Sequence, residues 1–322
     1  MLLAFLIISA GFVAFTNGAN ANCKGVASLY GSGTTSLRTA LWWGTFTTFA
    51  GSIAAVFLAE GLIKKFSGRG LVSDELLQSP SFTSAVATGA ALTSLLATRL
   101  GFPVSTTHAL VGALVGAGVA GAGDGVHFSA LGKNFFYPLL FSPLIAMLLG
   151  ATVYWLLRSI KMAPDRRHPI LDAAHFASAG AASFARGLND TPKMAALLLI
   201  VPKLPTGYAI LMIGIMIAIG ALIDARQVAE TLGKKITDMT PGQGFAANLV
   251  TAILVTTASF HSLPVSTTHV SVGSLLGMGA STNQAKWRTV FEILLAWITT
   301  VPCAAVIAAI AYFALRLIFK TS

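Results

Sequence analysis

Long apolar stretches separated by short polar connections form the main pattern of this sequence. A helix needs about 20 mostly apolar residues to cross the hydrocarbon core of a bilayer, and stretches of that length recur along the chain. They predict an all-α polytopic membrane protein with about five passes in each half. The expected passes are 2–28, 38–60, 81–100, 104–122 and 133–157, followed by 171–200, 205–226, 244–262, 264–280 and 289–316.

Two polar motifs interrupt this apolar pattern, and each occurs once in each half of the chain. The hexapeptide Pro-Val-Ser-Thr-Thr-His occupies residues 103–108 and again residues 264–269. The motif Gly-x-Asn-x-x-x-Lys begins at Gly18 and again at Gly187. The chain is therefore an internal duplication, which is typical of membrane transporters.

The boundary between the two repeats is expected at a short, charged segment that contains proline. We expect a first inverted repeat over residues 1–158, a cytoplasmic linker over 159–169 and a second inverted repeat over 170–322. An odd number of passes per repeat predicts that the second repeat is inserted upside down relative to the first. Residues 81–122 and 244–280 can instead be re-entrant hairpins, which enter and leave on one side and preserve this parity.

Composition and charge support a membrane protein and exclude several other classes. Hydrophobic residues make up 55% of the chain and charged residues 10%, whereas soluble proteins contain about 25% charged residues. The net charge of +10 does not indicate nucleic-acid binding, because the charges lie at the ends of the expected passes and not in a basic stripe with interleaved aromatics. The expected location is the cell inner membrane, and the Lys and Arg bias between the two sets of ends predicts that both termini are outside.

The repeated hexapeptide has the chemistry of an oxyanion site. Its proline disfavours continuous helix, and in lipid a broken helix persists only where it is buried or lines a cavity. Consecutive hydroxyls beside the N–H groups and positive dipole of a helix start suit a tetrahedral oxyanion. The alternative is that these hydroxyls only cap helices or bond between helices. The expected anion-binding residues are Ser105, Thr106, Thr107, Ser266, Thr267 and Thr268.

The Gly-x-Asn motifs add groups that can bind either an anion or a coupling cation. Glycine permits a helix break or a close backbone approach, and Asn20 and Asn189 carry amides that can serve both kinds of ligand. Asp190 is a carboxylate in an apolar stretch, so it is a functional candidate by default. It can bind Na⁺, carry a proton or accept a hydrogen bond from a protonated oxyanion. The alternative is an ion pair with Lys193 or Arg186 on the same helix.

Two lysines and two histidines complete the repeated motifs. Lys24 and Lys193 either anchor their helices by snorkelling or supply positive potential near the anion. His108 and His269 end the two hexapeptides. They are candidates for proton-sensitive groups, although hydrogen-bonded structural histidines are an equal alternative.

At these motifs the chain resembles the inorganic phosphate transporter (PiT) family, over nearly its whole length. The resemblance implies an inverted-repeat fold and uptake of an inorganic oxyanion coupled to Na⁺ or H⁺. It also implies that the repeated Asn, Asp, Ser and Thr residues line the anion and ion sites. The chain departs from the family at one place, because the usual first motif is Gly-Ala-Asn-Asp and Ala21 stands here in place of the Asp.

This departure leaves two substrates open. Phosphate near neutral pH carries a proton that needs an acceptor, whereas sulfate needs only donors. The loss of a carboxylate at Ala21 therefore favours sulfate, the substrate of a side branch of the family. Asp190 can still accept the phosphate proton, so phosphate is our first expectation and sulfate the alternative.

A different functional class also stays open. An anion channel would have re-entrant polar segments too, but it would pass anions without coupling to an ion gradient. An enzyme is not expected, because the sequence shows no nucleophile–base spacing. Besides the anion, the expected partners are the lipid bilayer and a coupling Na⁺ or H⁺, with no other metal, no cofactor and no nucleic acid. A homodimer is one candidate for the oligomeric state.

Overall fold

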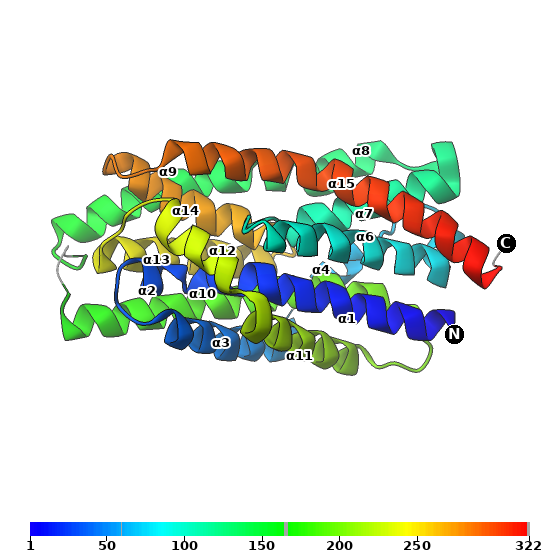
Figure 1. The fold of residues 1–322 in the computed structure, drawn as a ribbon, viewed down its shortest axis with the longest axis horizontal. Helices are drawn as coiled ribbons and strands as arrows, with labels where there is room; N and C mark the ends of the chain where they lie inside the picture. Colours follow the sequence, from blue (N-terminus) through cyan, green and yellow to red (C-terminus); the bar gives the residue numbers. More distant parts are fainter. Residues whose placement is uncertain (59, 164–166, 321–322) are drawn as a thin grey trace.

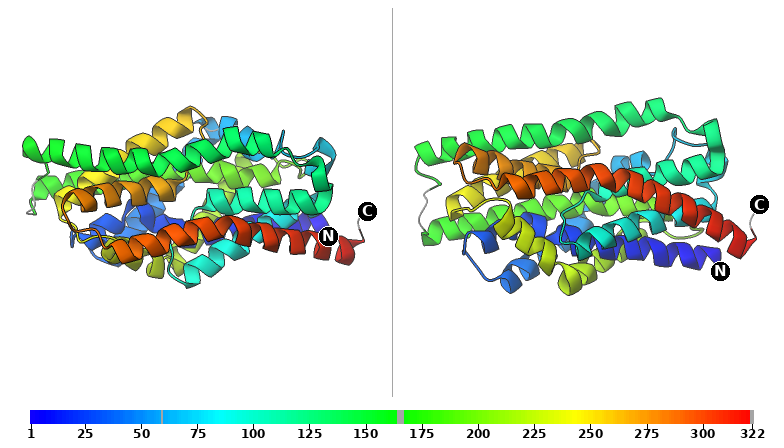
Figure 2. Two further views of the ribbon diagram at one scale, coloured as in Figure 1. Left: turned by 90° about the horizontal axis from the view of Figure 1, so that it is seen from above. Right: turned by 45° about the horizontal axis from the view of Figure 1, so that its top comes forward.

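The protein is one bundle of helices that run roughly along a common long axis (Figures 1 and 2). The computed structural model describes residues 1–58, 60–163 and 167–320. Residues 164–166 of the expected linker lie outside the described residues. The N- and C-termini lie at the same end of the bundle (Figure 1), as an even total number of passes requires.

The described residues form helices joined by short connections, which confirms the predicted all-α class. The first half contains α1 (Leu2–Ala21), η1 (Asn22–Gly25), α2 (Ala27–Gly31), α3 (Leu37–Leu58), α4 (Glu60–Phe66), α5 (Asp74–Leu77), α6 (Pro80–Arg99), α7 (Thr106–Ala122), α8 (Phe128–Leu131) and α9 (Tyr137–Ser159). The second half contains α10 (Pro169–Ala195), η4 (Ala196–Leu198), α11 (Thr206–Asp224), α12 (Arg226–Glu230), α13 (Pro241–Phe260), α14 (Thr267–Ser281) and α15 (Trp287–Phe319).

The ten expected passes correspond to ten of these helices. In the described part, seven helices are long and apolar enough to cross a membrane: α1, α3, α6, α9, α11, α13 and α15. Helices α7 and α14 are shorter, with 17 and 15 residues, and α10 carries charged residues within its buried part. The chain is thus a multi-pass membrane protein.

Both hexapeptides lie in helix breaks, as the sequence predicts. Helix α6 ends at Arg99 and α7 begins at Thr106, while α13 ends at Phe260 and α14 begins at Thr267. Gly101 and Ser262 hold equivalent places before the two hexapeptides, and both have left-handed φ angles, 75° and 53°. The two hairpins, α6–α7 and α13–α14, turn near the middle of the long axis (Figure 1). The hexapeptides therefore meet deep inside the bundle.

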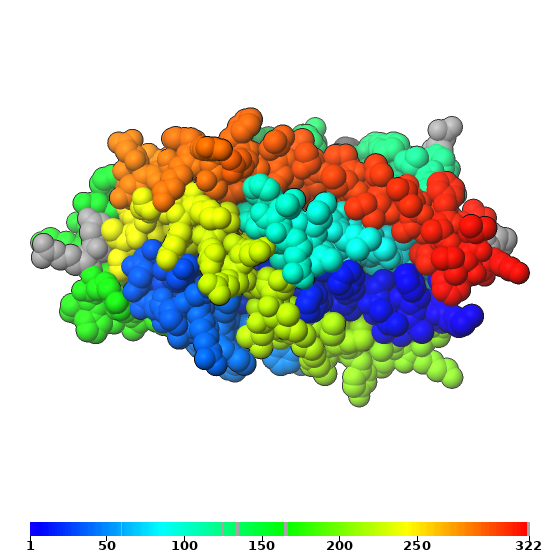
Figure 3. Space-filling model, viewed as in Figure 1, coloured from blue at the N-terminus to red at the C-terminus, as the bar shows by residue number. Residues whose placement is uncertain are grey.

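The two halves interleave instead of forming separate lobes (Figure 3). Helix α1 packs against α11 and α3 packs against α10, so equivalent pairs of helices cross between the halves. In the same way α7 packs against α15 and α9 against α14. Helix α1 runs away from the end that holds the termini, whereas α10 runs toward it (Figure 1). The inverted-repeat arrangement stays a prediction, and these matched contacts favour it.

Glycines of the repeated motif lie where helices of the two halves cross. A Cβ atom at Gly18 would lie 2.0 Å from the carbonyl oxygen of Ile217 on α11, and one at Gly187 would lie 2.0 Å from the carbonyl oxygen of Thr48 on α3. Small residues allow such close crossings in membrane bundles. The motif glycines therefore serve close approach and do not break their helices, because α1 continues beyond Gly18 to Ala21.

Gly18→Ala is expected to lower the thermal stability of the purified protein by several degrees, because overpacking of a tight contact costs about 1–3 kcal/mol. Gly11→Ala is the matched control on the same helix, since its Cβ would meet the side chain of Met216 at an ordinary 3.7 Å. The melting temperature of each variant is the measurement. Equal melting temperatures for the two variants would contradict this packing.

Candidate functional site

Ser105 and Ser266 begin the two short helices that follow the hexapeptides. The side chain of Ser105 accepts a hydrogen bond from the backbone N–H of His108 at 3.2 Å. Ser266 accepts the equivalent bond from His269, also at 3.2 Å. Both serines thus act as helix N-caps, the role that the sequence left as an alternative to anion binding. Both are buried.

The last threonine of each hexapeptide contacts the other hexapeptide. The Thr107 hydroxyl donates to the carbonyl oxygen of Val265 at 3.4 Å, and the Thr268 hydroxyl donates to the carbonyl oxygen of Val104 at 2.7 Å. The two turns therefore face each other and exchange equivalent bonds. The structure brings together the two hydroxyl clusters that the sequence analysis assigns to anion binding.

Both motif lysines lie inside this contact, so the snorkelling interpretation is wrong. Lys24 is 3% exposed and Lys193 is 1% exposed. The Lys24 ammonium donates to the carbonyl oxygen of Val104 at 2.9 Å and to the hydroxyl of Thr268. The Lys193 ammonium donates to the carbonyl oxygen of Val265 at 2.8 Å and to the hydroxyl of Thr107 at 3.0 Å. Each lysine thus joins its own half to the other half.

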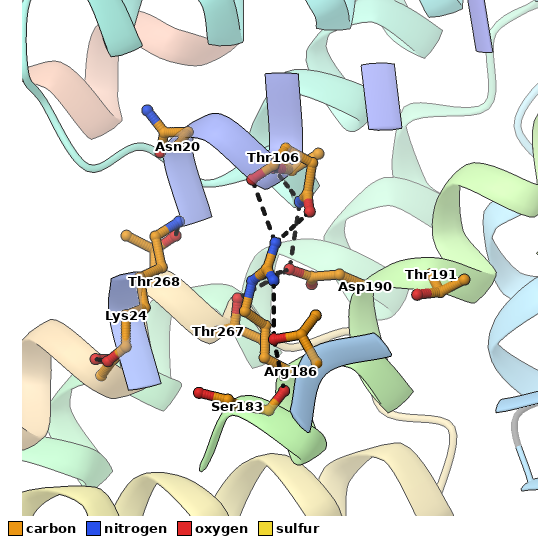
Figure 4. A network of polar contacts seen from close by, with 12 residues as sticks. Asn20, Lys24, Thr106, Ser183, Arg186, Asp190, Thr191, Thr267 and Thr268 are labelled. Carbon is orange, nitrogen blue, oxygen red and sulfur yellow. Dashed lines mark hydrogen bonds and ion pairs between the residues drawn. The ribbon is translucent and has the colours of Figure 1, made fainter. Parts of the chain in front are cut away.

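Asp190 lies at the centre of a buried charge network (Figure 4). Its Oδ1 atom is 3.1 Å from the Lys193 ammonium, and its Oδ2 atom is 3.7 Å from Nε of Arg186. The hydroxyl of Thr267 donates to Oδ2 at 3.2 Å, as does the side-chain amide of Asn17 at 3.3 Å. Both ion pairs considered from the sequence are present. The bond from Thr267 joins the carboxylate to the start of α14.

The two repeats differ in charge at two equivalent places. Asn17 and Ala21 of the first repeat correspond to Arg186 and Asp190 of the second. Arg186 donates to the backbone carbonyl of Asn17 at 3.2 Å and contacts its side-chain oxygen. The second repeat therefore carries a cation and its carboxylate partner, and the first repeat carries neither. This explains how Ala21 can replace a carboxylate without leaving an unpaired arginine.

The buried charges of the described residues do not balance. Lys24, Lys193 and Arg186 are buried basic side chains, and Asp190 is the only buried carboxylate in these ranges. Three basic side chains and one acidic side chain leave an excess of two basic groups in the described interior. Uncompensated buried charge is costly, so this region suits an added divalent anion.

The two motif asparagines have different roles. The Asn20 amide donates to the Thr98 hydroxyl at 3.0 Å and to the carbonyl of Phe102 at 2.9 Å, and its oxygen accepts from the N–H of Val104 at 3.0 Å. Asn20 therefore positions the first hairpin turn, and both of its side-chain polar atoms already have partners within the protein. Asn189 donates to the hydroxyl of Ser259 at 2.8 Å, whereas its side-chain oxygen is buried without a partner in the described part.

The rings of the two hexapeptide histidines lie against each other in a tilted arrangement, with centroids 4.6 Å apart and an interplanar angle of 41°. Nδ1 of His269 lies 3.1 Å from the carbonyl oxygen of Leu139, and its ring stacks on Trp297 at 3.9 Å. Trp297 in turn donates to the carbonyl oxygen of Pro103 at 2.9 Å. These contacts give His269 a structural role. That either histidine is proton-sensitive stays a prediction.

Two members of the network were not identified as site residues from the sequence. Asn17 and Arg186 stand directly before the repeated glycines, and this equivalent position was the signal that could have found them. Asn17 also donates to the hydroxyl of Thr106 at 2.8 Å, which ties the first hexapeptide to Asp190.

In the described ranges, no group of three or more His, Cys, Asp or Glu side chains could hold a metal ion. A cation here would therefore depend mainly on neutral oxygen donors.

Comparisons with known proteins agree with the repeated motifs. The model of the phosphate transporter family matches residues 17–308. A probable low-affinity inorganic phosphate transporter of Rhizobium meliloti (strain 1021) is 31% identical over 98% of this chain and 97% of its own length. A protein of the same description from Bacillus subtilis (strain 168) is 29% identical over 99% and 98%. A solved structure described as the sodium-dependent phosphate transporter shares the fold, with a TM-score of 0.83 and 23% identity over 98% of this chain and 99% of that one.

Proposed function

The chain belongs to the phosphate transporter family, and we propose that it carries inorganic phosphate across a membrane at the contact between its two hexapeptides. One observation carries this proposal. Among the described residues, the interior holds three basic side chains and one carboxylate, beside threonine hydroxyls at the starts of α7 and α14. Hydrogen phosphate carries two negative charges, and the starts of two helices add positive potential. The residues that would bind it are Thr106, Thr107, Thr267, Thr268, Lys24 and Lys193.

The side-chain oxygen of Asn189 favours phosphate over sulfate. It is a buried acceptor without a partner in the described part of the chain. Hydrogen phosphate has an O–H group that can satisfy such an acceptor, whereas sulfate has only acceptor oxygens. A buried acceptor that stays unpaired costs about 1–3 kcal/mol. The relatives described as phosphate transporters support the same choice.

Uptake of labelled phosphate and labelled sulfate by the purified protein in liposomes tests this proposal. Phosphate is expected to enter at least about tenfold faster than sulfate. A penalty of about 1.4 kcal/mol for the unpaired acceptor corresponds to a factor of ten. Liposomes without protein are the control. Equal uptake of the two anions would contradict the role of Asn189, and passage of phosphate only down its own gradient would indicate a channel.

We further propose that transport is secondary active and that the two repeats move against each other around this site. Lys24 and Lys193 each bond across the halves, so a relative movement would open and close the site. The coupling ion expected from the sequence is Na⁺ or H⁺, and Asp190 is the candidate coupling residue because it is a buried carboxylate within the network. A location in the cell inner membrane with both termini outside belongs to the same proposal.

A further inference from the structure

The unwound carbonyls at the two helix breaks already have cationic partners. In transporters with broken helices, helix N-termini face anionic groups, and unwound backbone carbonyls coordinate Na⁺. Val104 and Val265 lie in the two breaks, before α7 and α14. Their carbonyl oxygens accept hydrogen bonds from the ammoniums of Lys24 and Lys193, at 2.9 and 2.8 Å. The positions at which a broken helix offers its carbonyls to a cation are thus taken by side chains.

The hydrogen-bond partners of each ammonium are the kinds of oxygen that Na⁺ prefers. Lys24 bonds the carbonyl of Val104 and the hydroxyl of Thr268. Lys193 bonds the carbonyl of Val265, the hydroxyl of Thr107 and the carboxylate of Asp190. Hard cations bind carbonyl, hydroxyl and carboxylate oxygens, and an ammonium carries the same single charge as Na⁺.

A free Na⁺ cannot share these oxygens without a large repulsion. A second positive charge about 4 Å from an ammonium costs about 4 kcal/mol at an effective dielectric constant of 20. The described interior already holds two more basic than acidic side chains, so added Na⁺ would raise the positive charge further. The repulsion also acts at both breaks, because the two lysines hold equivalent positions.

We propose that Lys24 and Lys193 are tethered cations that take the place of bound Na⁺ at the two helix breaks, so that this transporter binds and moves phosphate without Na⁺. This inference rests on the proposed transport of phosphate. It separates the chain from the similar solved structure, whose description names it sodium-dependent. The lysines stay with the protein throughout the cycle, so these two positions add no Na⁺ to the coupling stoichiometry.

Exchange of phosphate across liposome membranes tests the inference on the unmodified protein. Equal phosphate is placed on both sides, labelled on one side, so that exchange needs binding and translocation but no ion gradient. The rate is expected to be the same in sodium, potassium and choline salts. A rate in choline more than about tenfold below that in sodium, a difference of roughly 1.4 kcal/mol, would overturn the inference and leave phosphate transport standing. Exchange that is absent in every salt would instead overturn the proposed function.

Lysine variants give a second, independent test of whether the two ammoniums replace Na⁺. Lys24→Met and Lys193→Met keep most of the side-chain length and remove the charge, so the vacated oxygens become available to Na⁺. Phosphate exchange by each variant is expected to be faster in sodium than in choline. Lys64→Met is the control, because Lys64 is exposed and pairs with Glu60 at 2.7 Å, outside the network. An Lys24→Met variant that exchanges phosphate in choline at the wild-type rate would overturn the inference.

Discussion

Asp190→Asn is expected to abolish accumulation of phosphate against its gradient while weakening phosphate binding much less. Asp190 is the only buried carboxylate of the described residues, and it contacts Lys193, Arg186 and Thr267. The substitution preserves size and hydrogen-bonding capacity but removes the charge. Loss of one partner of a buried ion pair lowers the stability of the folded protein by about 3–5 kcal/mol. The site itself becomes more positive, so it continues to attract an anion.

Two measurements on one preparation test this prediction: uptake under an imposed ion gradient, and phosphate affinity by equilibrium binding. Asp172→Asn is the matched control on the same helix, because Asp172 pairs with Arg167 at 2.8 Å outside the central network. If Asp190→Asn concentrates phosphate at near the wild-type rate, Asp190 has a structural role only. The coupling group must then be sought first at His108 and His269.

The double substitution Thr107→Val/Thr268→Val is expected to reduce phosphate transport by several orders of magnitude. Valine keeps the shape of threonine, so the change removes two hydroxyls that accept from the lysine ammoniums and that the proposal places beside phosphate. A hydrogen bond to a charged group contributes about 1.5–3 kcal/mol, so two lost bonds correspond to roughly a hundredfold to ten-thousandfold. Initial uptake rate in liposomes is the measurement.

Thr152→Val/Thr299→Val is the control for this double variant. Both of these threonines are exposed and bond only carbonyls of their own helices. The control is expected to transport phosphate at the wild-type rate. Full transport by Thr107→Val/Thr268→Val would show that the hexapeptide hydroxyls do not bind the substrate.

The sequence predicted the parts of the fold that depend on local pattern. Apolar length identified the ten long elements, and proline within the repeated hexapeptide identified the breaks before α7 and α14. The duplication also indicated that both hexapeptides belong to one site, because substrate sites of repeat-built transporters lie at the interface between the repeats. The ends of the helices were predicted less accurately than their existence. The first expected pass, 2–28, is an α-helix only to Ala21.

The remainder of the site depends on contacts that have no signal in the sequence. Whether Lys24 snorkels or is buried depends on how α14 packs beside η1, and local pattern does not determine that packing. The side chain of Asn20 bonds the backbone of Phe102 and Val104. The spacing of side chains in the sequence does not show which backbone groups a side chain will bond. The replacement of Arg186 and Asp190 by Asn17 and Ala21 can be seen when the two motifs are aligned, but the contact of Arg186 with Asn17 depends on how α1 and α10 pack.

The position of bound phosphate tests the central claim most directly. An experimental structure determined with phosphate should show one ion between Thr107 and Thr268, within hydrogen-bond distance of the Lys24 and Lys193 ammoniums. A phosphate ion bound elsewhere in the protein, with the two hexapeptides still bonded to each other, would contradict the claim.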